Sequence, residues 1–281
     1  MIRIATGVAR LRLSTRPLSG RVKQSESLVL TKIDSNTGYA EVTLNRAPVN
    51  GLNLELLETL GNTMDNLERE KVKGMILTSF SDKVFCAGLD IRELMDPNAE
   101  RLRSFWTALQ NLWVKLYGSS FPTVAVVNGH APAGGCFLAI ACEFRIMRQN
   151  CTIGLNETAL GITVPLWLQA TMRNTIGCRK TELACTSGKL YNSQEALEIG
   201  LVDELVVDKH EAIERAINFL DKFRNISSQP RSRTKLLLRI SDLDEFKCYR
   251  EKDLERFISN TLNAGFQQEL HQYFESLRSR K

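Results

Sequence analysis

The chain has 281 residues, of which 43% are hydrophobic and 25% are charged, and this composition is typical of a soluble globular protein with one substantial core. No stretch reaches the roughly 18 consecutive apolar residues that a membrane-spanning helix requires, so we expect no membrane insertion. The net charge of +5 comes from the amino terminus, where six Lys or Arg residues and no acid precede Glu26. Removing those six charges leaves −1, and a basic surface for nucleic acid is not predicted.

Residues 1–25 have the composition of a mitochondrial transit peptide, because they combine Arg, Ser and Thr with spaced apolar residues and lack acids. An untargeted tail is the alternative. The carboxyl terminus, SLRSRK, does not end in the peroxisomal signal SKL. We therefore expect the mature protein in the mitochondrial matrix.

The first half of the chain alternates strands and helices after this leader. Apolar runs predict strands at 28–34 and 39–46, joined by the turn SNTG, and further strands at 72–80 and 123–129. Helical spacing of apolar residues predicts helices over 53–71 and 99–117. This alternation predicts an α/β fold with parallel strand pairing.

The second half is predicted to be mainly helical. Helical periodicity marks 165–177, 179–188, 192–200 and 209–223, a break is expected at Pro230, and one or two terminal amphipathic helices are expected over 251–279. We divide the chain into the leader, an α/β core over 26–205 and a helical region over 206–281.

The cysteines and histidines give no metal-binding pattern. No two of the seven cysteines are spaced as a CxxC pair, and the three histidines, His130, His210 and His271, are scattered along the chain. We predict reduced cysteines, no metal site and no histidine base.

Three segments have the composition of a catalytic site because each places permissive or reactive residues beyond a predicted strand. They are VFCAGLDIREL (84–94), VNGHAPAGGCFLAIAC (127–142) and IGLNETALGITVP (153–165). Glycine turns let two loops aim backbone N–H groups at one oxygen, which makes an oxyanion hole for an enolate. Taken singly, AGLD or AGGC is better explained as an ordinary turn or helix C-cap, and Glu157 as a solvated loop or helix-cap carboxylate, which is the commoner environment of a Glu.

In this order and spacing, the three segments resemble the signature motifs of the crotonase (enoyl-CoA hydratase/isomerase) superfamily, over roughly residues 28–205. LNETALGITVPLW is especially similar to the delta-isomerase branch. The resemblance implies a spiral core of ββα turns with a C-terminal helical extension, an acyl-CoA substrate and a homotrimer or dimer of trimers. It implies no cofactor, since coenzyme A is part of the substrate.

The resemblance also implies a role for individual residues. The catalytic positions are Glu157 as the proton-carrying base and the N–H groups of Leu89 and Gly134 as the oxyanion hole. The implied substrate-binding residues are Ala87, Gly88, Leu89, Asp90, Ile91, Gly134 and Asn156.

The second carboxylate of the family's hydratases is replaced here by Phe137. A single base suffices to remove a proton from C2 and return one to C4, so we predict an isomerase of 3-cis- or 3-trans-enoyl-CoA in the β-oxidation of unsaturated fatty acids. Phe137 is also compatible with an ordinary core position. The alternatives are a hydratase, a dienoyl-CoA isomerase or a non-catalytic RNA-binding or scaffold relative.

Overall fold

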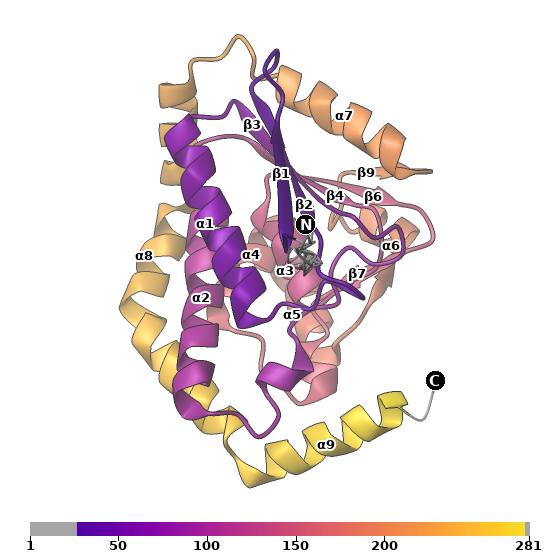
Figure 1. The fold of residues 1–281 in the computed structure, drawn as a ribbon, viewed down its shortest axis with the longest axis vertical. Helices are drawn as coiled ribbons and strands as arrows, with labels where there is room; N and C mark the ends of the chain where they lie inside the picture. The colour runs from indigo at the N-terminus through magenta and orange to yellow at the C-terminus, as the bar shows by residue number, and fades with distance from the viewer. Residues whose placement is uncertain (1–26, 279–281) are drawn as a thin grey trace, which may run out of the picture.

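The computed structural model describes residues 27–278, which form a mixed α/β fold around one main sheet (Figure 1). The predicted transit peptide lies outside the described residues. The sheet has the strand order β1-β2-β3-β4-β6-β9. Its strands are β1 (Val29–Ile33), β2 (Tyr39–Leu44), β3 (Gly74–Ser79), β4 (Thr123–Val127), β6 (Phe144–Arg148) and β9 (Glu204–Val206). The predicted hairpin β1-β2 is antiparallel and every later neighbouring pair is parallel, as predicted.

Helices cover both faces of this sheet. They are α1 (Leu54–Glu70), α2 (Ala99–Tyr117), α3 (Gly134–Ala141), α4 (Leu166–Ile176), α5 (Cys178–Ser187), α6 (Ser193–Glu198), α7 (Lys209–Asp221), α8 (Ser228–Thr261) and α9 (Ala264–Arg278). Figure 1 shows α1, α2 and α8 on one side and α7 on the other. Accordingly, one hydrophobic cluster joins the sheet to α1, α2 and α3, and a smaller cluster joins its opposite face to α7.

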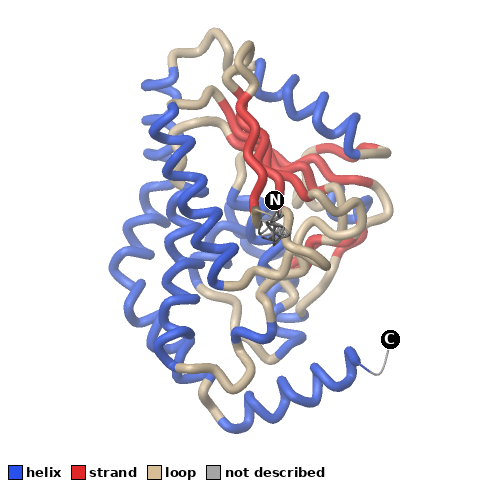
Figure 2. The backbone as a smooth tube through the Cα atoms, in the orientation of Figure 1, coloured by secondary structure: helices blue, strands red, loops and turns tan. Residues whose placement is uncertain are grey.

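A second, smaller sheet places the predicted site segments. It pairs β5 (Ala131–Pro132) with β7 (Thr152–Gly154), and β7 with β8 (Tyr191–Asn192). Figure 2 shows the strands in red, most of them gathered in the main sheet. The chain thus repeats the expected strand–strand–helix order, with β4, β5 and α3 followed by β6, β7 and the 3₁₀ helix η2 (Glu157–Leu160). The glycine turn and Glu157 therefore leave adjacent strands of one sheet.

The C-terminal helices differ from the sequence prediction. Pro230 does not break the chain, because it lies in the first turn of α8, where a proline removes no intrahelical hydrogen bond. No new helix begins near residue 251; α8 runs continuously from Ser228 to Thr261, and α9 follows it. Phe246, Leu254 and Phe257 of α8 pack into the main core, so this helix is a structural part of the fold.

Candidate active site

The first site loop carries Leu89 with its backbone N–H unpaired. The loop is fixed on both sides by Leu52, whose N–H donates to the Gly88 carbonyl (2.8 Å) and whose carbonyl accepts from the Asp90 N–H (2.9 Å). Gly88 has φ +91°, a conformation that favours glycine. Between these two hydrogen bonds, the Leu89 N–H has no acceptor among the described residues. It is therefore available to a ligand.

The glycine turn carries the second unpaired donor. Ala133 has φ +47° and donates its N–H to the Gly154 carbonyl (2.8 Å), which fixes the turn to β7. Gly134 is the first residue of α3, where a backbone N–H has no intrahelical acceptor. The helix N-terminus also favours negative charge at this point.

The two loops are in direct contact because the turn contains glycines. A Cβ atom on Gly135 would lie 2.2 Å from the Cys86 carbonyl oxygen, and a Cβ atom on Gly134 would lie 3.1 Å from the Gly88 Cα. Any side chain at these positions would push the loops apart. The structure thus brings the Leu89 and Gly134 segments into direct contact.

Glu157 is a buried carboxylate without a counter-ion. It follows β7 as the first residue of η2, is 6% exposed, and its Oε2 has no hydrogen-bond partner within the part of the chain that the structure describes. Burial raises the pKa of Glu157 to about 7. Burial, and then the charge of Glu157, raise the pKa of the Cys136 thiol, which places the carboxylate in electrostatic reach of the first turn of α3. A carboxylate with this pKa suits proton transfer near neutral pH.

Asn156 and Phe137 occupy two further positions that the resemblance connects with the base. The Oδ1 atom of Asn156 is buried without a partner among residues 27–278, so it is free to accept a hydrogen bond from a ligand. Phe137 is fully buried, with its ring edge-on to Trp167 at a centroid distance of 5.8 Å. An apolar ring therefore occupies the position that the resemblance assigns to a second carboxylate in hydratases.

The rest of the first loop is held by ion pairs that involve Asp90. Although partial burial alone raises the pKa of Asp90, hydrogen bonds from Arg92 and Arg46 lower it to about 2. Arg46 lies 2.8 Å from Asp90 and also donates to the Gly51 carbonyl, while Ala87 donates its N–H to Val49.

Ile91 begins the 3₁₀ helix η1 (Ile91–Glu93) and packs against the core. Arg46 and Leu52 were not predicted, because nothing in their local sequence marks a contact with a loop some 40 residues later.

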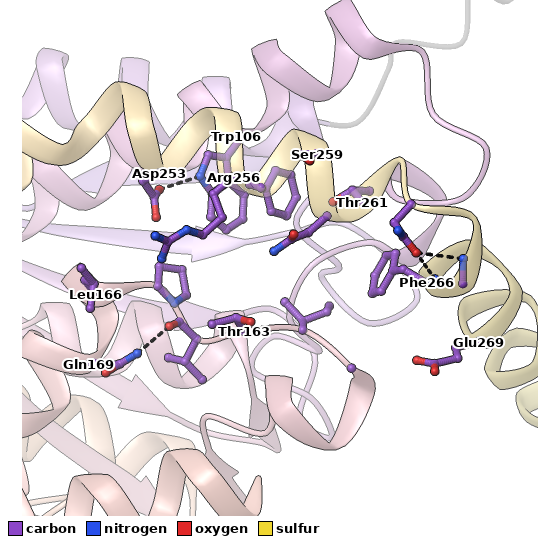
Figure 3. A pocket seen from close by; sticks show the side chains of 18 of the residues that line it. Trp106, Thr163, Leu166, Gln169, Asp253, Arg256, Ser259, Thr261, Phe266 and Glu269 are labelled. Carbon is purple, nitrogen blue, oxygen red and sulfur yellow. Dashed lines mark hydrogen bonds between the residues drawn. The ribbon is translucent and has the colours of Figure 1, made fainter.

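Two cavities flank the segment that follows Glu157. Residues 161–164 line both, one of about 420 Å³ against α8 and α9 (Figure 3) and one of about 710 Å³ against α5. Thr158 and Cys185 line the second cavity, and burial followed by the charge of Glu157 raises the pKa of Cys185 to about 11. Both cavities therefore lie close to the base.

Over the described residues, no cluster of His, Cys, Asp or Glu is arranged to hold a metal ion, and no helix there has the length and apolarity needed to cross a membrane.

The strand–strand–helix fold, the contact between the two glycine-containing loops and the buried Glu157 agree with the crotonase class that the sequence resembles. The family model for enoyl-CoA hydratase/isomerase matches residues 34–280, and the chain belongs to this family.

Within the family, the chain is similar to proteins named for isomerisation. It is 38% identical over 267 residues to "Enoyl-CoA delta isomerase 1, mitochondrial" of Rattus norvegicus, covering 94% of this chain and 92% of the relative. The human protein of the same name is 37% identical over 256 residues, covering 90% and 84%.

The crystal structure of human mitochondrial delta3-delta2-enoyl-CoA isomerase matches with a TM-score of 0.88 and 36% identity, over 91% of this chain and all of that one. An enoyl-CoA hydratase from Bacillus halodurans matches with a TM-score of 0.80 and 27% identity, over 88% of this chain and all of that one. The predicted family and fold are confirmed.

Proposed function

We propose that this chain is an enoyl-CoA isomerase that converts 3-cis- or 3-trans-enoyl-CoA into 2-trans-enoyl-CoA in the β-oxidation of unsaturated fatty acids. The observation that carries the proposal is the buried carboxylate of Glu157, whose Oε2 has no hydrogen-bond partner among the described residues and whose pKa is raised to about 7. The relatives named for the same activity, at 37–38% identity over most of both chains, support it.

The reaction needs one base and one anion-binding site. Ionised Glu157 takes a proton from C2 of the substrate, and the electron pair of that C–H bond moves into a dienolate whose negative charge lies on the thioester oxygen. The N–H groups of Leu89 and Gly134 stabilise this oxygen, a contribution worth about 10²–10³ in rate for each donor. Protonated Glu157 then returns the proton to C4, and the double bond ends between C2 and C3. Atoms and charge balance without a redox cofactor or metal.

The same geometry disfavours addition of water. Hydration needs one group to activate water and another to protonate the α-carbon, and the resemblance places a second carboxylate where Phe137 stands. The buried ring offers no proton-transfer group and excludes water from this side. A hydratase or dienoyl-CoA isomerase remains the alternative for the assay to test.

Binding of the coenzyme A portion is assigned to the first loop. The backbone of this loop offers N–H and C=O groups to the pantetheine amides, and the buried Asn156 Oδ1 offers a further acceptor. The residues proposed to line the substrate site are Ala87, Gly88, Leu89, Asp90, Ile91, Gly134 and Asn156.

We further propose a homotrimer or dimer of trimers located in the mitochondrial matrix. Leu237, Leu238 and Ile240 of α8 are 62%, 78% and 48% exposed, and a run of exposed apolar side chains is typical of a surface that another subunit covers. The names of the rat and human relatives include "mitochondrial", in line with the transit-peptide composition of residues 1–25. Light scattering of the parent and of Leu238→Glu tests the assembly, which should dissociate in the variant.

The deciding experiment supplies purified protein with 3-hexenoyl-CoA and, separately, with 2-hexenoyl-CoA. We expect conversion of the first to 2-hexenoyl-CoA and little addition of water to the second. Fast hydration without double-bond migration would assign the chain to the hydratases, and inactivity on both substrates would overturn the proposed chemistry.

A further inference from the structure

The cavity of about 420 Å³ begins one turn beyond the proposed base (Figure 3). Ile162, which lines it, donates its N–H to the Glu157 carbonyl at 3.0 Å. Across the cavity, Trp106 of α2 stacks on Phe257 of α8 with ring centroids 3.6 Å apart, and Phe266 of α9 adds a third ring. These surfaces suit an alkyl chain.

The cavity is also tied to the loop that carries the proposed oxyanion donor. Gln267 of α9 donates to the Leu94 carbonyl at 2.8 Å and accepts from the Asp96 N–H at 2.9 Å. Helix α9, whose Phe266 and Glu269 line the cavity, is therefore anchored to the segment that follows Leu89.

Asp253 of α8 lines this cavity with a buried carboxylate, and the residue is only 6% exposed. Its Oδ2 accepts hydrogen bonds from the indole Nε1 of Trp106 (2.8 Å), the Nε2 of Gln110 (2.9 Å) and the indole Nε1 of Trp167 (3.2 Å). Three donors on a single oxygen fix the carboxylate in one orientation.

The other oxygen of Asp253, Oδ1, receives no hydrogen bond from the described residues, and Figure 3 shows the carboxylate at the edge of the cavity. Arg256 also lines the cavity, but its guanidinium lies over the Tyr249 ring, 5.5 Å from the centroid, and forms no ion pair with Asp253. The cavity therefore presents an unpaired carboxylate oxygen as a hydrogen-bond acceptor, in a lining that combines aromatic rings with aliphatic and polar side chains.

We propose that this cavity receives the far end of the acyl chain and that Asp253 selects chains that carry a hydroxyl group there; this inference rests on the proposed isomerase function. A short chain leaves water on the Asp253 carboxylate. A longer plain alkyl chain displaces that water and offers no donor. The Oδ1 atom of the charged Asp253 is then left without a hydrogen bond. A terminal hydroxyl replaces the water and donates to the same oxygen.

The experiment measures kcat/KM for 3-enoyl-CoA substrates of increasing length, each with and without a terminal hydroxyl. For short chains we expect equal values within each pair. Once the chain reaches the cavity, the hydroxylated member should be preferred by about tenfold, the discrimination typical of a hydrogen bond to a charged group.

The variant Asp253→Asn keeps an oxygen for the two indoles and Gln110 but places a neutral amide toward the cavity. The preference for the hydroxylated chain should fall to about threefold or less, because a neutral hydrogen bond is roughly half as strong. Asp242→Asn is the matched control. Asp242 is a buried carboxylate on the same helix, 7% exposed and bonded to Tyr117 and Asn174, and it does not line this cavity, so its variant should keep the full preference.

The outcomes separate this inference from the proposed function. Turnover of short chains with no hydroxyl preference at any length would overturn the role of Asp253 and leave the isomerase proposal standing. A preference that survives intact in Asp253→Asn would also overturn it. Absence of turnover on every substrate would instead remove the isomerase proposal, and this inference with it. The length series in the parent protein decides the question even if the variant fails to fold.

Discussion

The surroundings of Glu157 and Glu143 differ in the supply of hydrogen-bond donors. Glu157 is buried near the glycine turn and its Oε2 has no donor among the described residues. Glu143, just before β6, lies under α8 and forms ion pairs with Lys235 (2.9 Å) and Arg231, and it also accepts from the Thr123 N–H. Both carboxylates are largely shielded from water, so the contrast between them lies in their hydrogen-bond and ion-pair partners.

This difference separates a carboxylate that stabilises the fold from one that is suited to proton transfer. Around Glu143, burial lowers the pKa of Lys235 to about 8 while the charge of Glu143 opposes that shift, so the pair offsets part of the cost of burial. Around Glu157, burial has no compensating charge and raises the pKa to about 7. A buried carboxylate without a partner costs stability, and the proposed reaction gives a reason for its presence.

The largest expected effect is the loss of turnover in Glu157→Gln. The amide has the shape of the carboxylate but cannot take a proton from C2, so kcat for 3-hexenoyl-CoA should fall by about 10³-fold. The free energy of unfolding in urea should be unchanged or higher, because the variant removes a buried ionisable group without a partner. A loss of less than about tenfold would mean that another group is the base.

Glu143→Gln should show the opposite pattern. Removing this carboxylate leaves the buried side chains of Lys235 and Arg231 of α8 without their counter-charge. We expect the free energy of unfolding to fall by about 3 kcal/mol in urea titrations. At a temperature where the variant is folded, kcat should stay within about twofold of the parent. A variant of normal stability that lost turnover would contradict the division of roles between the two carboxylates.

The pH dependence of turnover and of stability tests the role of Glu157 further. Since Glu157 acts as a base, kcat/KM should rise with pH and level off above an apparent pKa of about 7. Its pKa is higher in the folded than in the unfolded chain, so the folded state holds the proton more tightly. The contribution of Glu157 to the free energy of unfolding should therefore decrease by about 3 kcal/mol as pH rises from about 4.5 to 7. Comparing parent and Glu157→Gln unfolding curves across this range isolates the effect.

A structural feature can be predicted from the sequence when the residues that cause it lie close together along the chain. The spacing of apolar residues predicts α1 and α2 to within one residue, because each buries one regular stripe. The full length of α8 is not predicted. Part of its burial comes from long-range partners such as the Lys235 contact with Ser119, 116 residues away, which leave no periodic pattern.

The residues of the proposed site also differ in whether the local sequence predicts them. The glycines and the lone Glu157 are visible in the sequence because special backbone conformations and isolated carboxylates are local features. Asp253 is invisible there, since its donors Trp106 and Trp167 are 147 and 86 residues away. Contact between the two loops also depends on tertiary structure, through the close approach of Gly135 to Cys86.

The smallest expected effect concerns Asp90, a third carboxylate, which lies in the first loop itself. Like Glu143 it is paired, with Arg46 and Arg92, yet like Glu157 it adjoins the proposed site. In Asp90→Asn the ion pairs weaken, but an Asn side chain still caps η1, and the backbone hydrogen bonds from Leu52 still hold the loop. We expect kcat/KM for 3-hexenoyl-CoA to fall by about fivefold, the scale of a partly exposed ion pair, with the apparent pKa near 7 unchanged. A shifted pH profile would instead show that Asp90 and Glu157 interact electrostatically, and that the loop ion pairs set the proton affinity of the base as well as the position of the Leu89 N–H.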